Sequence, residues 1–137
     1  MIKDIRPALR AFLLADPQIS AMVGGVRGHH LTLPQGQREP SIVYQRITGL
    51  GDHHMQGPSG LTRPRFQIDA YAQTPDDATR LADLVKARLD GYRGPMTAGS
   101  ETVAVQGVFF DTERENYDGT AELYRVGRDY VFWLEER

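Results

Sequence analysis

The 137-residue chain contains no cysteine, and this absence excludes several kinds of chemistry at once. Without a thiol there is no disulfide, no thiolate zinc site and no cysteine nucleophile. Long hydrophobic runs are missing too: the longest in the N-terminal segment, residues 11–15, is too short for a signal-peptide core or a membrane span. We therefore expect synthesis in the cytoplasm.

Neither sign of charge forms a block along the chain. Sixteen basic residues stand against eighteen acidic ones, which gives a formal net charge of −2. Proteins that bind DNA through counterion release usually present a clustered basic face, so sequence-specific binding of nucleic acid is not expected. The composition, 40% hydrophobic and 25% charged, is typical of a globular protein, and we expect one domain over residues 1–137.

The usual catalytic and nucleotide-binding signatures are also missing. None of the four serines lies in a G-x-S-x-G nucleophile elbow, and no P-loop or dinucleotide-binding fingerprint occurs. A carboxylate pair could be drawn from Asp111, Glu113 and Glu115, but a run of charges in a predicted turn is usually only solvated. We therefore predict no catalytic residue and no cofactor.

Two histidine pairs, His29-His30 and His53-His54, are the only feature that resembles a metal site. Adjacent residues in an extended segment point to opposite sides, so they rarely chelate one ion together. Solvated loop histidines are the favoured interpretation, and no metal ligand is predicted. A small metal-dependent hydrolase that uses these histidines is the least favoured alternative.

Two segments have the periodicity of amphipathic helices. Apolar residues recur at helical spacing over residues 3–15, and Pro17 is expected to end that helix or bend it into a short second one. Over residues 74–91, a capping Thr74, Pro75 and two aspartates precede an apolar stripe and a terminating glycine. This second helix is the most clearly indicated element of the chain.

Strands are predicted over residues 41–48, 63–72, 102–110 and 121–134. Residues 26–40 are predicted to be irregular, with room for one short strand, and residues 111–119 to form a charged turn. The strand at 63–72 should bury one face and leave the other more exposed to solvent. In the strand at 102–110, Val103, Val105 and Phe109 should share a face. Arg128 interrupts the apolar row of the last strand, so we expect that strand to expose part of both faces.

The element order indicates an α+β fold, a two-layer sandwich in which two main helices pack on one face of a largely antiparallel sheet. Residues 49–60 are too rich in glycine and too long for a tight turn, and they are interpreted as a hairpin arm. Such arms often become ordered against a neighbouring subunit.

Several segments together resemble the tail terminator, or tail completion, family of siphophages and gene transfer agents. They are LRAFLLADPQISAMVGG, LPQG with EPSIVYQRITG, LTRPRFQIDAYAQTPDDATRLADLVKARLDGYRG, VQGVFFDTERENYD and YRVGRDYVFWLEE. The similarity runs over nearly the whole chain, although no single motif is diagnostic.

The resemblance implies a non-enzymatic virion protein of the tail and neck. Such subunits assemble as a hexameric ring on the head-proximal end of the tail tube, end its polymerisation and offer a surface to head-completion or connector proteins. DNA passes through the ring without sequence-specific binding, and no membrane is involved. A head-closure or neck adaptor protein of the same particle is the main alternative.

Contacts with a partner are predicted in the arm and in the charged turn. The predicted contact residues are Asp52, His53, His54, Met55 and Gln56 in the arm, and Asp111, Glu113, Arg114 and Glu115 in the charged turn.

Overall fold

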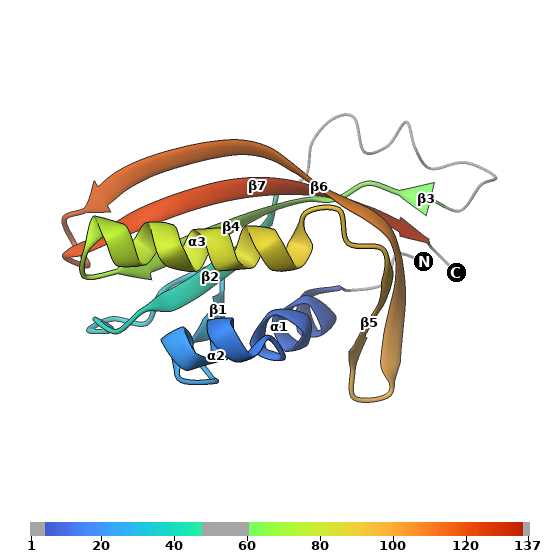
Figure 1. Cartoon of the computed structure of the whole chain (residues 1–137), viewed down its shortest axis with the longest axis horizontal. Helices are drawn as coiled ribbons and strands as arrows, with labels where there is room; N and C mark the ends of the chain where they lie inside the picture. The colour runs from blue at the N-terminus through green and yellow to red at the C-terminus, as the bar shows by residue number, and fades with distance from the viewer. Residues whose placement is uncertain (1–4, 48–60, 136–137) are drawn as a thin grey trace.

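One curled sheet and three helices make up residues 5–47 and 61–135, the part of the chain that the computed structural model describes (Figure 1). In chain order the elements are α1 (Arg6–Leu14), α2 (Pro17–Val23), β1 (Gly28–His30), β2 (Ser41–Ile47), β3 (Leu61–Thr62), β4 (Arg65–Ala72), α3 (Pro75–Leu89), β5 (Gly94–Ala98), β6 (Glu101–Asp118) and β7 (Leu123–Glu135). The predicted α+β class is confirmed.

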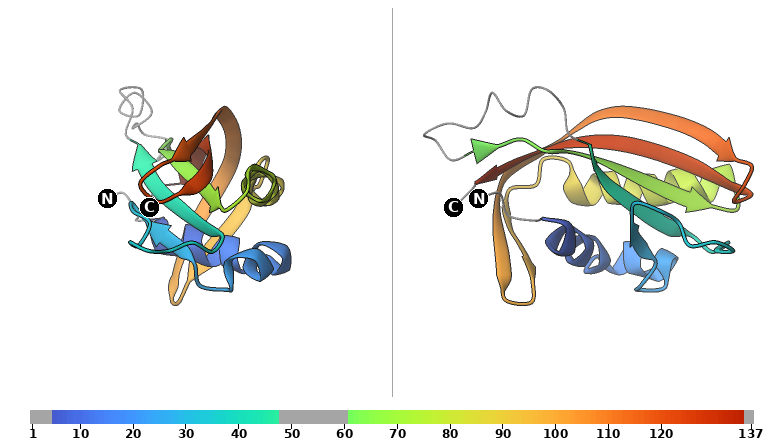
Figure 2. Two further views of the ribbon diagram at one scale, coloured as in Figure 1. Left: turned by 90° about the vertical axis from the view of Figure 1, so that its left-hand side faces the viewer. Right: turned by 180° about the vertical axis from the view of Figure 1, so that it is seen from behind.

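The sheet differs in detail from the expected antiparallel layer. Its strand order is β1-β2-β4-β7-β6-β5, with β3 pairing to β7, and β1 runs parallel to β2 while the other pairs are antiparallel. The sheet also curls, because α1 contacts both β1 and β5, the strands at its two ends. In place of the expected two-layer sandwich there is a mixed, curled sheet with three helices (Figures 1 and 2).

The helix boundaries follow from capping chemistry. The carboxylate of Asp16 accepts hydrogen bonds from the main-chain N–H groups of Gln18 (2.8 Å) and Ile19 (3.2 Å), so a second helix, α2, begins at Pro17. The predicted short second helix is therefore confirmed. Thr74 caps α3 by accepting from the N–H of Asp77 at 3.1 Å, as its position in the sequence predicts.

The core lies between the concave face of the sheet and the helices. The apolar stripe of α3 is buried there, and Phe66 of β4 meets Phe132 of β7 edge to face with ring centroids 5.3 Å apart. Both phenylalanines are fully buried. The core thus fixes β4 and β7 under α3, and the long ribbon of β6 and β7 arches over that helix (Figure 1).

The predicted charged turn at residues 111–119 is wrong, because β6 continues as a strand to Asp118. The register against β7 shifts between Val105 and Gly107, and again between Phe110 and Thr112. Each shift moves the following side chains to the other face. Val108 is consequently buried and Phe109 is 52% exposed, which corrects the prediction that Phe109 shares a face with Val103.

The second face of β4 is also less exposed to solvent than predicted. Asp69 and Tyr71 are 4% and 7% exposed although they alternate with the core residues. Tyr71 packs with Val43 and Leu123 in a small second cluster on the convex side. Polar residues in an alternating pattern therefore do not mark a solvated face here.

Candidate interaction surface

The convex face of the sheet carries a network of charged side chains centred on Asp129 of β7. This carboxylate is 8% exposed and accepts from Arg114 at 2.8 Å, from the Thr112 hydroxyl at 3.1 Å and from Arg65 at 3.5 Å. Arg65 also pairs with Asp111 at 2.6 Å. These contacts join β4, β6 and β7 through their side chains.

A second buried carboxylate, Asp69 of β4, extends this network. Both of its oxygens accept from the Gln67 amide at 3.0 Å, and Arg125 lies 4.0 Å away. Burial raises the pKa of Asp69, against the opposing effects of the Gln67 hydrogen bond and the nearby arginines. A Cβ atom on Gly127 would lie 2.5 Å from Asp69 Oδ1, so the close approach of this carboxylate requires a glycine opposite it.

On the concave side, Arg128 of β7 holds α3 to β6. Its guanidinium donates to Glu113 of β6 and pairs with Asp83 of α3 at 2.8 Å, while the residue itself is only 7% exposed. The sequence signal for this contact was the charge that interrupts the apolar row of the last strand. The interruption marks a buried arginine that pairs with two partly exposed carboxylates, not a strand that exposes both faces.

The predicted contact residues fall into three groups. Asp111, Glu113 and Arg114 lie on β6 and take part in the ion pairs above. Glu115 is exposed on the same strand, and its carboxylate makes no hydrogen bond or ion pair with a described residue. The arm residues Asp52, His53, His54, Met55 and Gln56 lie outside the described residues.

His29 and His30 occupy adjacent positions of β1 and have different neighbours. His30 contacts Arg6 (Nε2 to Nη1, 3.2 Å) and the ring of Tyr44, whereas His29 lies near Arg10 and Arg27. Burial, followed by these two arginines, lowers the pKa of His29. Within residues 5–47 and 61–135 no group of three or more side chains could hold a metal ion, and His53 and His54 lie outside that range.

The lowered pKa of His29 predicts a pH-dependent stability. The folded protein binds fewer protons at this site than the unfolded chain, so its stability should fall as pH drops below the ordinary value of 6.5. Thermal melts between pH 8 and pH 5 should show this fall, and His29→Gln should reduce it. His30→Gln is the matched control. An equal slope in wild type and His29→Gln would contradict the assignment.

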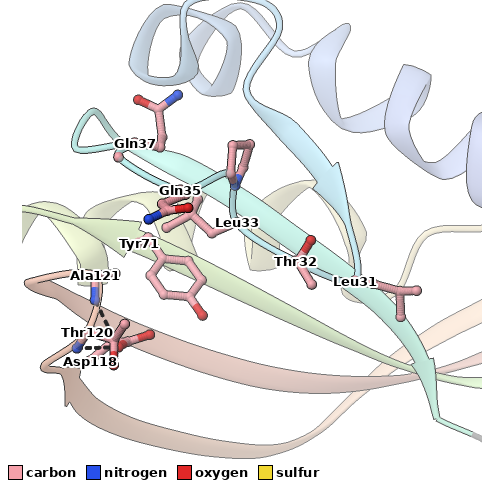
Figure 3. A pocket seen from close by; sticks show the side chains of 11 residues that line it. Leu31, Thr32, Leu33, Gln35, Gln37, Tyr71, Asp118, Thr120 and Ala121 are labelled. Atoms are coloured by element: carbon pink, nitrogen blue, oxygen red, sulfur yellow. Dashed lines mark hydrogen bonds between the residues drawn. The ribbon is translucent and has the colours of Figure 1, made fainter.

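A groove of 430 Å³ opens between residues 31–37 and the turn that joins β6 to β7 (Figure 3). Tyr71 lines it, and its one carboxylate, Asp118, accepts from the main-chain N–H groups of Thr120 (3.0 Å) and Ala121 (3.2 Å). Because that carboxylate already stabilises the turn, the groove offers no acid and base pair. No helix of the described chain is long and apolar enough to cross a membrane.

Comparison with known families gives these features a context. Residues 7–135 match the model of the family described as Tail completion protein gp17. The chain belongs to this family. It is therefore a structural virion protein and not an enzyme, as its resemblance to tail completion proteins implies, and it assembles with other proteins of the tail or head.

A solved structure shares the fold of this tail completion protein. A chain in the structure titled "Virion of native gene transfer agent (GTA) particle" superposes with a TM-score of 0.70 at 17% sequence identity. The match covers 96% of this chain and 94% of that chain. No sequence relative was found among curated proteins.

Proposed function

We propose that this tail completion protein forms a hexameric ring on the head-proximal end of the tail tube. The ring ends tube polymerisation and presents the surface to which the head joins. The observation that carries the proposal is the family match over residues 7–135. A cap of this kind must bind the last tube ring better than another tube subunit does, so its function is differential affinity and needs no catalytic site.

The proposed partners are the tail tube protein on one side and a head-completion or connector protein on the other, with assembly in the cytoplasm of the bacterial host. DNA crosses the ring without sequence-specific contacts. A formal net charge of −2 supports free passage, because a strongly basic channel would hold the phosphate backbone. The arm at residues 49–60 is proposed to contact a neighbouring subunit or the tube.

The test is the length of tail tubes made without this protein. In a producing strain that lacks it, we expect tubes of irregular, excessive length without heads, because nothing ends their growth. Purified protein added to growing tubes should stop elongation. Native mass spectrometry should detect a 15.4 kDa monomer in the free protein and six copies on tube ends.

The same measurement distinguishes a neck adaptor. Headless tubes of normal length would show that another protein ends the tube and that this chain acts on the head side. Protein that binds neither tubes nor heads would contradict both assignments.

A further inference from the structure

The free edge of β6 is acidic. Beyond Val105, β6 pairs only with β7 among the described strands, and the chain after α3 covers it at Val108 and Phe110. Residues 111–118 are left as a strand edge with four carboxylates and one arginine. We name this stretch the acidic edge. Charged side chains at such an edge oppose indiscriminate strand pairing, so a partner must be complementary in charge.

The side of the molecule formed by α1 and β1 is basic. Arg10 donates to the carbonyls of Gly28 (3.0 Å) and Val26 (2.9 Å), and Arg27 to those of Pro40 (2.7 Å) and Met22 (3.0 Å). Neither arginine pairs with a described carboxylate, so main-chain acceptors fix their positions without neutralising them. We name Arg10, Arg27 and the neighbouring Val26 the basic side.

The basic side and the acidic edge belong to different sides of the molecule. In both figures the arch of β6 lies on one side of the molecule and the helices α1 and α2 lie on the other (Figures 1 and 2). One end of the strand order is β1, and the free part of β6 lies near the other. A contact between them therefore joins two different copies of the chain.

Exposed apolar side chains gather on the same two surfaces. Val26 (64% exposed) precedes β1, whereas Phe109 (52%), Tyr117 (53%) and Tyr124 (37%) lie on β6 and the facing part of β7. With Leu31 (55%) in the groove of Figure 3, these are all the large apolar side chains that are exposed among the described residues. In the acidic edge Asp111 and Glu113 are already paired with arginines, so Glu115, which lies beside Tyr117 and Tyr124, is the carboxylate left for a partner. Each surface thus combines an unpaired charge with exposed apolar area, the composition of a protein contact.

We infer that the acidic edge of one copy binds the basic side of the next copy, so that the ring closes head to tail. The inference rests on the proposed ring and names the surfaces that form it. A closed ring needs heterologous contacts between two different, complementary patches. Opposite charge on two different sides of one subunit meets that requirement and disfavours contact between two acidic edges.

The absence of native cysteine permits a direct test by cross-linking. The full-length variant Val26→Cys/Glu115→Cys, treated with a short bis-maleimide, should give covalent chains longer than dimers, both at high concentration alone and on tail tubes. Each single-cysteine variant can give dimers at most. Val26→Cys/Glu101→Cys is the matched control, because Glu101 is exposed on the part of β6 that pairs with β5. This variant should give no cross-linked chains longer than dimers.

Charge reversal provides a second measurement. Glu115→Lys and Val26→Glu should each weaken ring assembly by at least about tenfold, because each places like charges in contact. An equal mixture of the two variants should restore assembly, since each altered surface then meets its complement. Glu101→Lys changes the net charge of the chain by the same amount as Glu115→Lys and should assemble like wild type.

The outcomes separate this inference from the capping function. Cross-linked chains longer than dimers would support the head-to-tail contact. If the protein at the same time had no effect on the length of the tail tubes, the capping function would be rejected. Tubes capped by rings, with no cross-linked chains longer than dimers and no rescue by mixing, would keep the cap and overturn the contact. Dimers from Glu115→Cys alone, together with no species longer than a dimer from the double variant, would show a contact between two acidic edges and overturn it as well.

Discussion

Phe132→Ala should destabilise the monomer by about 3–5 kcal/mol, the cost typical of removing a fully buried aromatic side chain. Phe132 is 0% exposed and meets Phe66 across the centre of the core. Its loss leaves a cavity between β4 and β7, the two strands that lie under α3. Because typical domains are stable by only about 5–15 kcal/mol, much of the variant should be unfolded on mild heating.

The matched control is Phe109→Ala on the neighbouring strand. Phe109 is 52% exposed and touches Trp133 with ring centroids 6.4 Å apart. Its removal should cost less than about 1 kcal/mol, because little apolar surface leaves the core. Urea titrations followed by circular dichroism compare the two variants directly. If both variants lost the same free energy of unfolding, the second half of β6 would have a different register from the one described.

The sequence predicted the elements whose pattern depends on one local cause. The caps at Asp16 and Thr74 and the apolar stripe of α3 are local signals, and the structure places these helices where they indicate. The strand cores around Phe66 and Phe132 were likewise evident from alternation. In each case the neighbouring residues decide the conformation.

The features that the sequence could not predict depend on contacts between residues far apart in the chain. The charged run at residues 111–118 looks like a turn because its polar side chains have no local reason to extend. It is a strand because β7 supplies a complete ladder, and because carboxylates and arginines alternate across the two strands. The parallel pairing of β1 and the curl of the sheet likewise depend on contacts across the chain.

The candidate surface was only half predicted, for the same reason. Asp111, Glu113, Arg114 and Glu115 were predicted to contact a partner, and this stays a prediction. Their division into three ion-paired residues and one carboxylate without a partner required the register of β6. The basic side was not evident in the sequence, because Arg10 and Arg27 lie 17 positions apart and are brought to one side by hydrogen bonds to the main chain around β1.

Arg128→Glu should be strongly destabilising, by about 4 kcal/mol or more. The guanidinium of Arg128 is held between Asp83 and Glu113, with 9% of its side chain exposed. A glutamate there would bury a third carboxylate beside two others and would remove the link between α3 and β6. Arg80→Glu, at an exposed position of α3, is the matched control and should change stability by less than about 0.5 kcal/mol.

A comparison with Arg128→Met separates charge from packing. Asp83 and Glu113 keep 61% and 38% of their side chains exposed, so water can solvate both once the guanidinium is gone. Methionine retains the apolar stem and should therefore cost only about 1–2 kcal/mol. Equal losses in the free energy of unfolding for Arg128→Met and Arg128→Glu would show that packing alone places Arg128 at this position.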